Sequence, residues 1–111
     1  MTNSRMPPFL SSVIMTCLAF PVFAQDLEGR TWSEQKCVLY DRAVQDALGF
    51  QGREGLREEF LRENQSFIDG DCQTYGNVCP ITDAEIELAN LLTIMTMNEG
   101  MASTFVPFNC Q

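Results

Sequence analysis

Apolar residues recur at spacings of three and four in three stretches of the chain, which is the period of a helix with one buried face. The first stretch covers residues 31–49 and begins with Thr31 and Glu34, spaced as in a capping box. Gly49 is its predicted end, because glycine readily takes the left-handed conformation that closes a helix. The inward face of this predicted helix is formed by Cys37, Tyr40, Val44, Ala47 and Leu48.

The second stretch covers residues 53–67 and follows the first after a short loop, residues 50–52. So short a connection predicts that the two helices pack as a hairpin. Gly55 weakens the first turn of this helix, and residues 68–71 are typical of an exit turn. Its apolar stripe is formed by Leu56, Phe60, Leu61, Phe67 and Ile68.

The third stretch carries the strongest helix signal. Thr82 and Glu85 are spaced as a second capping box, and Asp83 adds negative charge beside the positive end of the helix dipole. Apolar residues then occupy more than one face, which predicts a central helix covered by the other two. These residues are Ala84, Ile86, Leu88, Leu91, Leu92, Met95 and Met97.

The last residues, 101–111, follow Gly100 and carry aromatic and apolar side chains back across the predicted core. Pro107 favours an extended tail or a short turn there, because proline cannot continue a helix. Strict alternation of apolar and polar residues is absent outside residues 104–107. We therefore predict an all-α fold: a small bundle of three main helices with an extended C-terminal tail, stapled by two disulfides.

The start of the chain has a different pattern, with a single Arg5 before an apolar stretch over residues 7–23. The stretch closes on Val22 and Ala24, the small residues that favour cleavage after position 24. Its longest apolar part, residues 10–23, has about 14 residues and is interrupted by Ser11, Ser12, Thr16 and Pro21, whereas a membrane span needs roughly 20 continuous apolar residues. We predict a cleaved signal peptide over residues 1–24, a single helical disulfide-stapled domain over residues 25–111, and a periplasmic or secreted protein.

Export would place four of the five cysteines in an oxidising compartment, where disulfides persist. The favoured pairs are Cys72 with Cys79, closing the loop between the second and third helices, and Cys37 with Cys110, fastening the tail. The alternative pairs, Cys37 with Cys72 and Cys79 with Cys110, stay open, as does the crossed pattern.

The charge is strongly negative and unevenly distributed. The net charge is −8, and loss of Arg5 with the signal peptide would make it −9. After Arg62 the chain has seven acidic residues and no Lys or Arg. This distribution argues against nucleic acid or an anionic membrane as a partner, and it favours a cationic protein partner.

Catalytic and metal-binding patterns are missing. The chain has no histidine, the commonest general base, and no Cys-x-x-Cys redox pair. Cys72 and Cys79 are too far apart for a zinc knuckle. A calcium loop starting at Asp69 would have Thr74 where Gly is needed and Pro80 where Glu is needed. We therefore predict no catalytic residue, cofactor or metal site, and no enzyme activity.

Three methionines close together, at positions 95, 97 and 101, lie near the end of the third predicted helix. They can fill the core, line an adaptable groove for a partner, or bind Cu(I) through their thioethers. Together with the acidic first turn they define a candidate interaction surface: Asp83, Glu85, Glu87, Met95, Met97 and Met101.

Two short segments, Cys79-Pro80 before the third helix and Pro107-Phe108-Asn109-Cys110 at the end, resemble the plan of small disulfide-stapled helical periplasmic proteins of the Rap1a/Tai immunity type. That resemblance implies a protein that blocks a toxin. Together with the missing catalytic signature, it favours a small exported noncatalytic protein that binds another periplasmic or secreted protein as an inhibitor, immunity factor or accessory subunit. The alternative is a carrier of a small ligand or Cu(I) at the methionine-rich end of the third helix.

Overall fold

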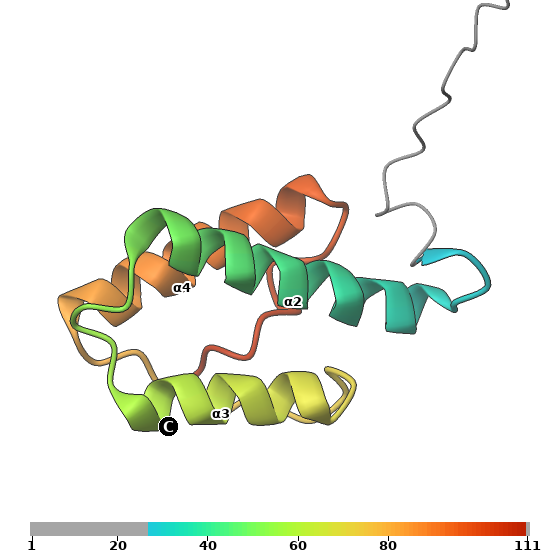
Figure 1. Cartoon of the computed structure of the whole chain (residues 1–111). Coiled ribbons are helices and arrows are strands. Elements are labelled where there is room, and N and C mark those ends of the chain that lie inside the picture. Colours follow the sequence, from blue (N-terminus) through green and yellow to red (C-terminus); the bar gives the residue numbers. More distant parts are fainter. Residues whose placement is uncertain (1–26, 111) are drawn as a thin grey trace, which may run out of the picture.

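A computed structural model describes residues 27–110, so the predicted signal peptide lies outside the described residues. Three long helices follow one another in this part: α2 (Trp32–Gln51), α3 (Glu58–Asp69) and α4 (Asp83–Asn98) (Figure 1). The predicted all-α fold with three helices and two disulfides is confirmed.

Helix α2 begins as predicted but ends later. The Thr31 hydroxyl accepts a hydrogen bond from the backbone N–H of Glu34 at 3.2 Å. Gly49 continues the helix, and Gly52, with φ of +83°, closes it by donating its N–H to the Leu48 carbonyl. The predicted end at Gly49 was wrong because Gly52 is the glycine that adopts the left-handed conformation.

Helix α3 begins at Glu58, five residues after the predicted start. The preceding residues form a turn, in which Leu56 donates its N–H to the Arg53 carbonyl and Gly55 has φ of +82°. A Cβ atom on Gly55 would lie 2.8 Å from the Cβ of Ala84, so this turn packs tightly against the start of α4. Tertiary packing on α4 therefore replaces the first turn of the helix that the sequence predicted over residues 53–67.

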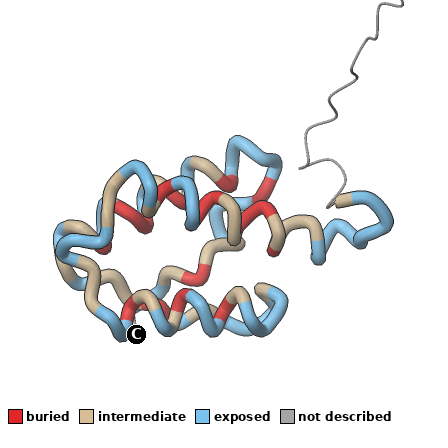
Figure 2. Tube along the Cα trace, viewed as in Figure 1, coloured by how far each residue is buried: buried red, intermediate tan, exposed pale blue. Residues whose placement is uncertain are grey.

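Helices α2 and α4 run antiparallel and form the centre of the fold. At one end the Gln51 side chain donates to the Ala84 carbonyl at 2.7 Å, and at the other Leu39 and Glu99 line the same cavity. Helix α3 covers one side of this pair (Figure 2). Its Phe67 ring meets the ring of Tyr40 edge to face, with the ring centroids 5.4 Å apart. The buried cluster consists of Tyr40, Ala43, Val44, Ala47, Phe60, Phe67, Val78, Leu88 and Leu92.

The C-terminal tail returns along the segment that precedes α4. Val78 donates its N–H to the Pro107 carbonyl and accepts a hydrogen bond from the N–H of Asn109, both at 3.1 Å. A Cβ atom on Gly76 would lie 2.1 Å from the Cα of Pro107, so only glycine fits this crossing. The extended end of the tail is thus fixed by main-chain contacts, and the Phe108 ring stacks on Phe60.

The disulfides join Cys37 to Cys72 and Cys79 to Cys110, with Cα–Cα distances of 5.4 and 4.6 Å. The favoured pairing of Cys72 with Cys79 and Cys37 with Cys110 was therefore wrong. Cys37 faces the end of α3, where its Sγ lies 3.6 Å from the Ile68 carbonyl oxygen, and the tail beside Val78 brings Cys110 to Cys79. One bridge closes the α2–α3 hairpin, and the other ties the segment before α4 to the tail.

Candidate interaction surface

The buried carboxylate of Glu85 joins the α2–α3 turn to α4. Its oxygens accept hydrogen bonds from the Arg57 side chain at 2.9 to 3.1 Å and from the backbone N–H groups of Arg57 and Ile81 at 2.7 and 2.9 Å. Arg57 also donates to the Cys79 carbonyl at 3.1 Å, and the Thr82 hydroxyl donates to the Gly55 carbonyl at 2.6 Å. This cluster sets the position of α4 against the rest of the fold.

The surroundings of Glu85 favour its ionised form. Burial raises the pKa of this carboxyl, but the hydrogen bonds from Arg57 and from the backbone of residues 57, 81 and 82 lower it more, and the resulting pKa is about 2. The carboxylate in turn raises the pKa of the Arg57 guanidinium. The predicted placement of Glu85 on an interaction surface was wrong, because its side chain is fully buried and its oxygens are occupied by hydrogen bonds within the protein.

The three methionines do not share one surface. Met101 is buried at 5% exposure, so its predicted place on an interaction surface was also wrong, while Met97 is 50% exposed and Met95 is half-buried. Two helical positions differ by about 200° in direction, so Met95 and Met97 point to nearly opposite sides of α4. The three thioethers are therefore not arranged around one copper ion.

The outward side of α4 carries three exposed apolar residues, which we call the outer row: Ile86, Ile94 and Met97. Ile86 is 44% and Ile94 57% exposed, and the polar, exposed Asn90 lies between them. The prediction that the other two helices cover α4 was wrong, because α2 packs against it from one side and α3 lies mainly against α2. Asp83 and Glu87, both predicted surface residues, lie exposed on this same side.

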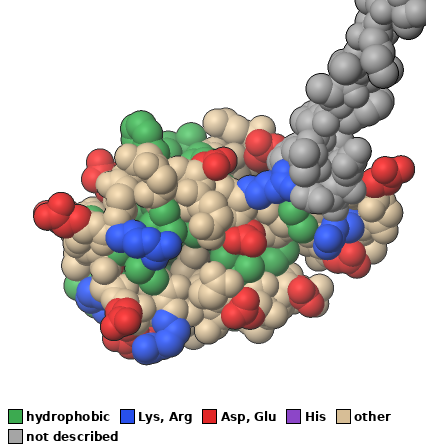
Figure 3. Space-filling view, viewed as in Figure 1, with side chains coloured by type: hydrophobic (Ala, Val, Ile, Leu, Met, Phe, Trp, Pro, Cys, Tyr) green, Lys and Arg blue, Asp and Glu red, His purple; other side chains and the backbone are tan. Residues whose placement is uncertain are grey.

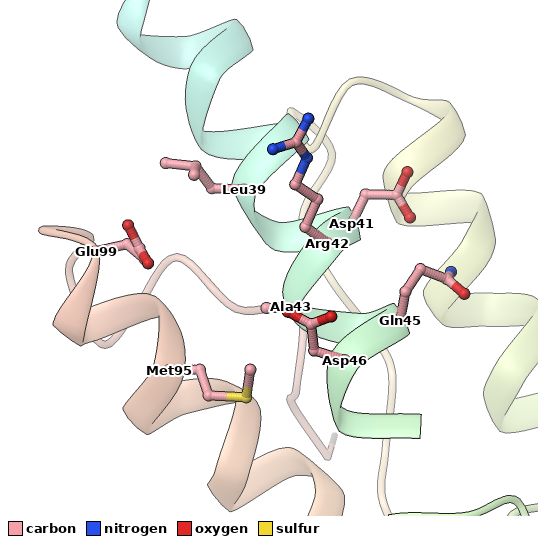
Figure 4. Close-up of a pocket in the computed structure, with 8 residues that line it drawn as sticks. All are labelled: Leu39, Asp41, Arg42, Ala43, Gln45, Asp46, Met95 and Glu99. Atoms are coloured by element: carbon pink, nitrogen blue, oxygen red, sulfur yellow. The ribbon is translucent and has the colours of Figure 1, made fainter. Parts of the chain in front are cut away.

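A groove lies between α2 and α4, and we call it the α2–α4 groove. One cavity of about 400 Å³ is bordered by Leu39, Ala43 and Asp46 on α2 and by Met95 and Glu99 beside them (Figure 4). A second cavity of about 280 Å³ continues from Asp46 and Met95 and is almost wholly apolar. Its remaining lining residues are Ala47, Phe50 and Leu91.

Small residues explain why the groove is hollow. Ala43 and Ala47, one turn apart on α2, are buried at its base, where a larger side chain would fill the space. Phe50 stands at one end with 87% of its surface exposed. The periodicity of the sequence predicted Ala47 on the inward face of the first helix, but it did not single out Ala43 and could not show a groove beside them.

The charges at the groove are mostly acidic. Asp41, Asp46 and Glu99 line the larger cavity together with Arg42, which is engaged in an interaction of its own. On the face shown in Figure 3, hydrophobic side chains reach the surface between scattered acidic and basic groups. The groove therefore combines apolar walls with an excess of negative charge.

The part of the chain that the structure describes contains no metal-binding arrangement. Among residues 27–110, no group of three or more His, Cys, Asp or Glu side chains is placed to hold a metal ion. In the same residues, every buried side-chain nitrogen or oxygen has a hydrogen-bond partner. No helix among them is long and apolar enough to cross a membrane.

Comparisons with known proteins gave no match to any family model, curated protein or solved structure. The resemblance to periplasmic immunity proteins therefore stays a prediction.

Proposed function

We propose that this chain is a noncatalytic binding protein whose outer row and α2–α4 groove dock onto another protein with a basic surface. The two disulfides indicate an oxidising compartment, and the leader pattern supports the periplasm or the extracellular medium. An inhibitory, immunity or accessory role fits this proposal equally well.

The exposed outer row is the observation that carries the proposal. Ile86, Ile94 and Met97 lie within about three turns of one helix and are each roughly half exposed. Phe50, at one end of the α2–α4 groove, adds an exposed aromatic ring. Burying the exposed half of such a side chain contributes about 1 kcal/mol. Exposed apolar side chains gathered on one side of a helix and bordered by polar residues are typical of protein interaction sites.

The charges around this surface favour a basic partner. Asp83, Glu87, Asp46 and Glu99 border it, and no Lys or Arg follows Arg62 in the chain. Two copies of this chain would bring like charges together across such an interface, which disfavours self-association. A partner that presents Lys or Arg around an apolar centre would instead gain both burial and electrostatic attraction.

The test begins with capture from the periplasm or culture medium of the source organism, using the mature oxidised protein as bait. Any captured protein is then purified, and its Kd is measured by calorimetry at low and high salt. The variants are Ile94→Asn in the outer row and Tyr75→Ser as the control. Tyr75 is 99% exposed but lies in the loop after α3.

We expect a basic partner whose binding weakens about tenfold or more with Ile94→Asn and with added salt, and is unchanged by Tyr75→Ser. A partner that binds the Ile94→Asn variant as tightly as the wild type would contradict the proposal. So would a purified protein that carries Cu(I) and loses it on replacement of Met95, Met97 and Met101.

A further inference from the structure

The α2–α4 groove is about as long as one short helix. Leu39 and Phe50 mark its ends on α2, and eleven residues of helix span about 16 Å, or three turns. Ala43 and Ala47 are buried at its base, so an occupant would contact mainly the more exposed side chains of Phe50, Leu91 and Met95. A segment of about eleven helical residues therefore matches the length of the groove.

The walls of the groove decide the conformation of what can bind there. Both walls are helices, whose backbone N–H and C=O groups are already paired along α2 and α4, so they offer no strand edge. An extended peptide would bury its own backbone groups against Ala47, Leu91 and Met95 without partners, which is costly. A helix satisfies its backbone internally and presents only side chains.

The chemistry of the groove changes along its length. The cavity beside Phe50 and Leu91 is almost wholly apolar, Asp46 borders both cavities, and Glu99 lies on the side of Leu39. An occupant therefore needs apolar side chains on its inward face and a Lys or Arg within reach of Asp46 and Glu99. The long stem of that residue would lie over Met95 while its charge meets the acids.

We propose that the partner segment recognised by the α2–α4 groove is a basic amphipathic helix of about three turns, which packs as a fourth helix on α2 and α4. This inference rests on the proposed function and specifies the chemistry of the occupant. Other occupants, including a second copy of this chain, are outcomes of the test.

The test uses three synthetic peptides of about fourteen residues, built from leucine, lysine, alanine and glutamine. The first places leucines at helical spacing with lysines beside them, the second has the same composition in scrambled order, and the third has a central proline in the first pattern. Affinity for the mature protein is measured by calorimetry, and peptide helicity by circular dichroism. Sedimentation measures the oligomeric state of the free protein.

Groove variants and matched controls separate docking from general charge attraction. Phe50→Ser removes the exposed ring at the apolar end, and Asp46→Asn removes the acid that borders both cavities. The controls are Tyr75→Ser for an exposed aromatic residue and Asp69→Asn for an exposed acid on α3. Asn at position 69 keeps the oxygen that accepts a hydrogen bond from Gln65.

We expect the amphipathic peptide to become helical and bind about tenfold or more tightly than the other two, with affinity reduced by both groove variants and by neither control. Equal binding of all three peptides that still depends on Phe50 and Asp46 would overturn the helical occupant while leaving the proposed function standing. Binding unaffected by the groove variants, or no binding, would also overturn the inference. If the free protein is a dimer and the peptide dissociates it, the occupant of the groove is a second copy of this chain. That result would also overturn the inference.

Discussion

Replacing Glu85 with Gln tests the buried junction that positions α4. The pKa of Glu85 is about 2 in the fold against an ordinary value of 4.5, so its ionised form stabilises the fold by about 3 kcal/mol above pH 4.5. Glu85→Gln keeps the shape of the side chain but removes the charge and turns one acceptor into a donor facing backbone N–H groups. We expect a loss of about 3 kcal/mol at neutral pH, the size seen when one partner of a buried ion pair is removed.

The sign of the pH dependence follows from the lowered pKa. A carboxyl group with a depressed pKa in the fold contributes fully above the unfolded value, and its contribution is lost as the pH falls toward the folded value. For Glu85 the window runs from about pH 4.5 down to about pH 2. The difference in stability between wild type and Glu85→Gln should therefore shrink to about 1 kcal/mol at about pH 2.5.

Urea denaturation followed by far-UV circular dichroism, at neutral pH and near pH 2.5, measures this difference. Glu87→Gln, on the exposed side of the same helix, is the matched control and should stay within about 0.5 kcal/mol of the wild type. The reasoning is refuted if Glu85→Gln is as stable as the control at neutral pH. It is equally refuted if the difference between wild type and Glu85→Gln does not shrink in acid.

Three further predictions concern the backbone and the disulfides. Gly76→Ala should cost more than about 2 kcal/mol in urea denaturation, because its Cβ would lie 2.1 Å from a tail Cα atom. Gly49→Ala is the control, because a Cβ atom at this position of α2 has no atom within 4 Å, and it should be neutral or stabilising. Equal losses of stability in the two variants would contradict the close contact between Gly76 and the tail. Cys37→Ser and Cys110→Ser should each cost about 4 kcal/mol, because the bridged cysteines are 35 and 31 residues apart, and a large inequality in the thermal midpoints would count against this pairing. Limited chymotrypsin cleavage after Tyr75 should yield two fragments that separate in denaturing gels without reductant, whereas fragments joined until reduction would show a different pairing.

The local parts of the fold could be predicted from the sequence because their signals lie close together in the chain. Thr82 and Glu85 form the expected capping box, and the apolar stripe of α2 predicts its core face. The start of α3 could not be predicted, because the close contact of Gly55 with Ala84 depends on packing across 29 residues.

Longer-range features left no signal in local periodicity. The disulfide pairing depends on which face of α2 meets α3. The number of residues between two cysteines determines only the entropy of closing that loop in the unfolded chain, so it does not reveal the pairing. Glu85 resembled any other acid of a first helical turn, because its partner Arg57 lies 28 residues away. Helix α4 has apolar residues on several faces. A buried central helix has the same composition as a helix with one exposed apolar side, so the sequence alone does not distinguish the two.

The rate of methionine oxidation in the free protein and in its complex tests most directly whether the outer row is a docking surface. Peroxide oxidation followed by mass spectrometry reports Met97, which is 50% exposed, and Met101, which is 5% exposed and serves as the internal reference. The account predicts that Met97 is oxidised faster than Met101 in the free protein and slows when the purified partner binds. A Met97 oxidation rate that is the same with and without the bound partner would contradict it.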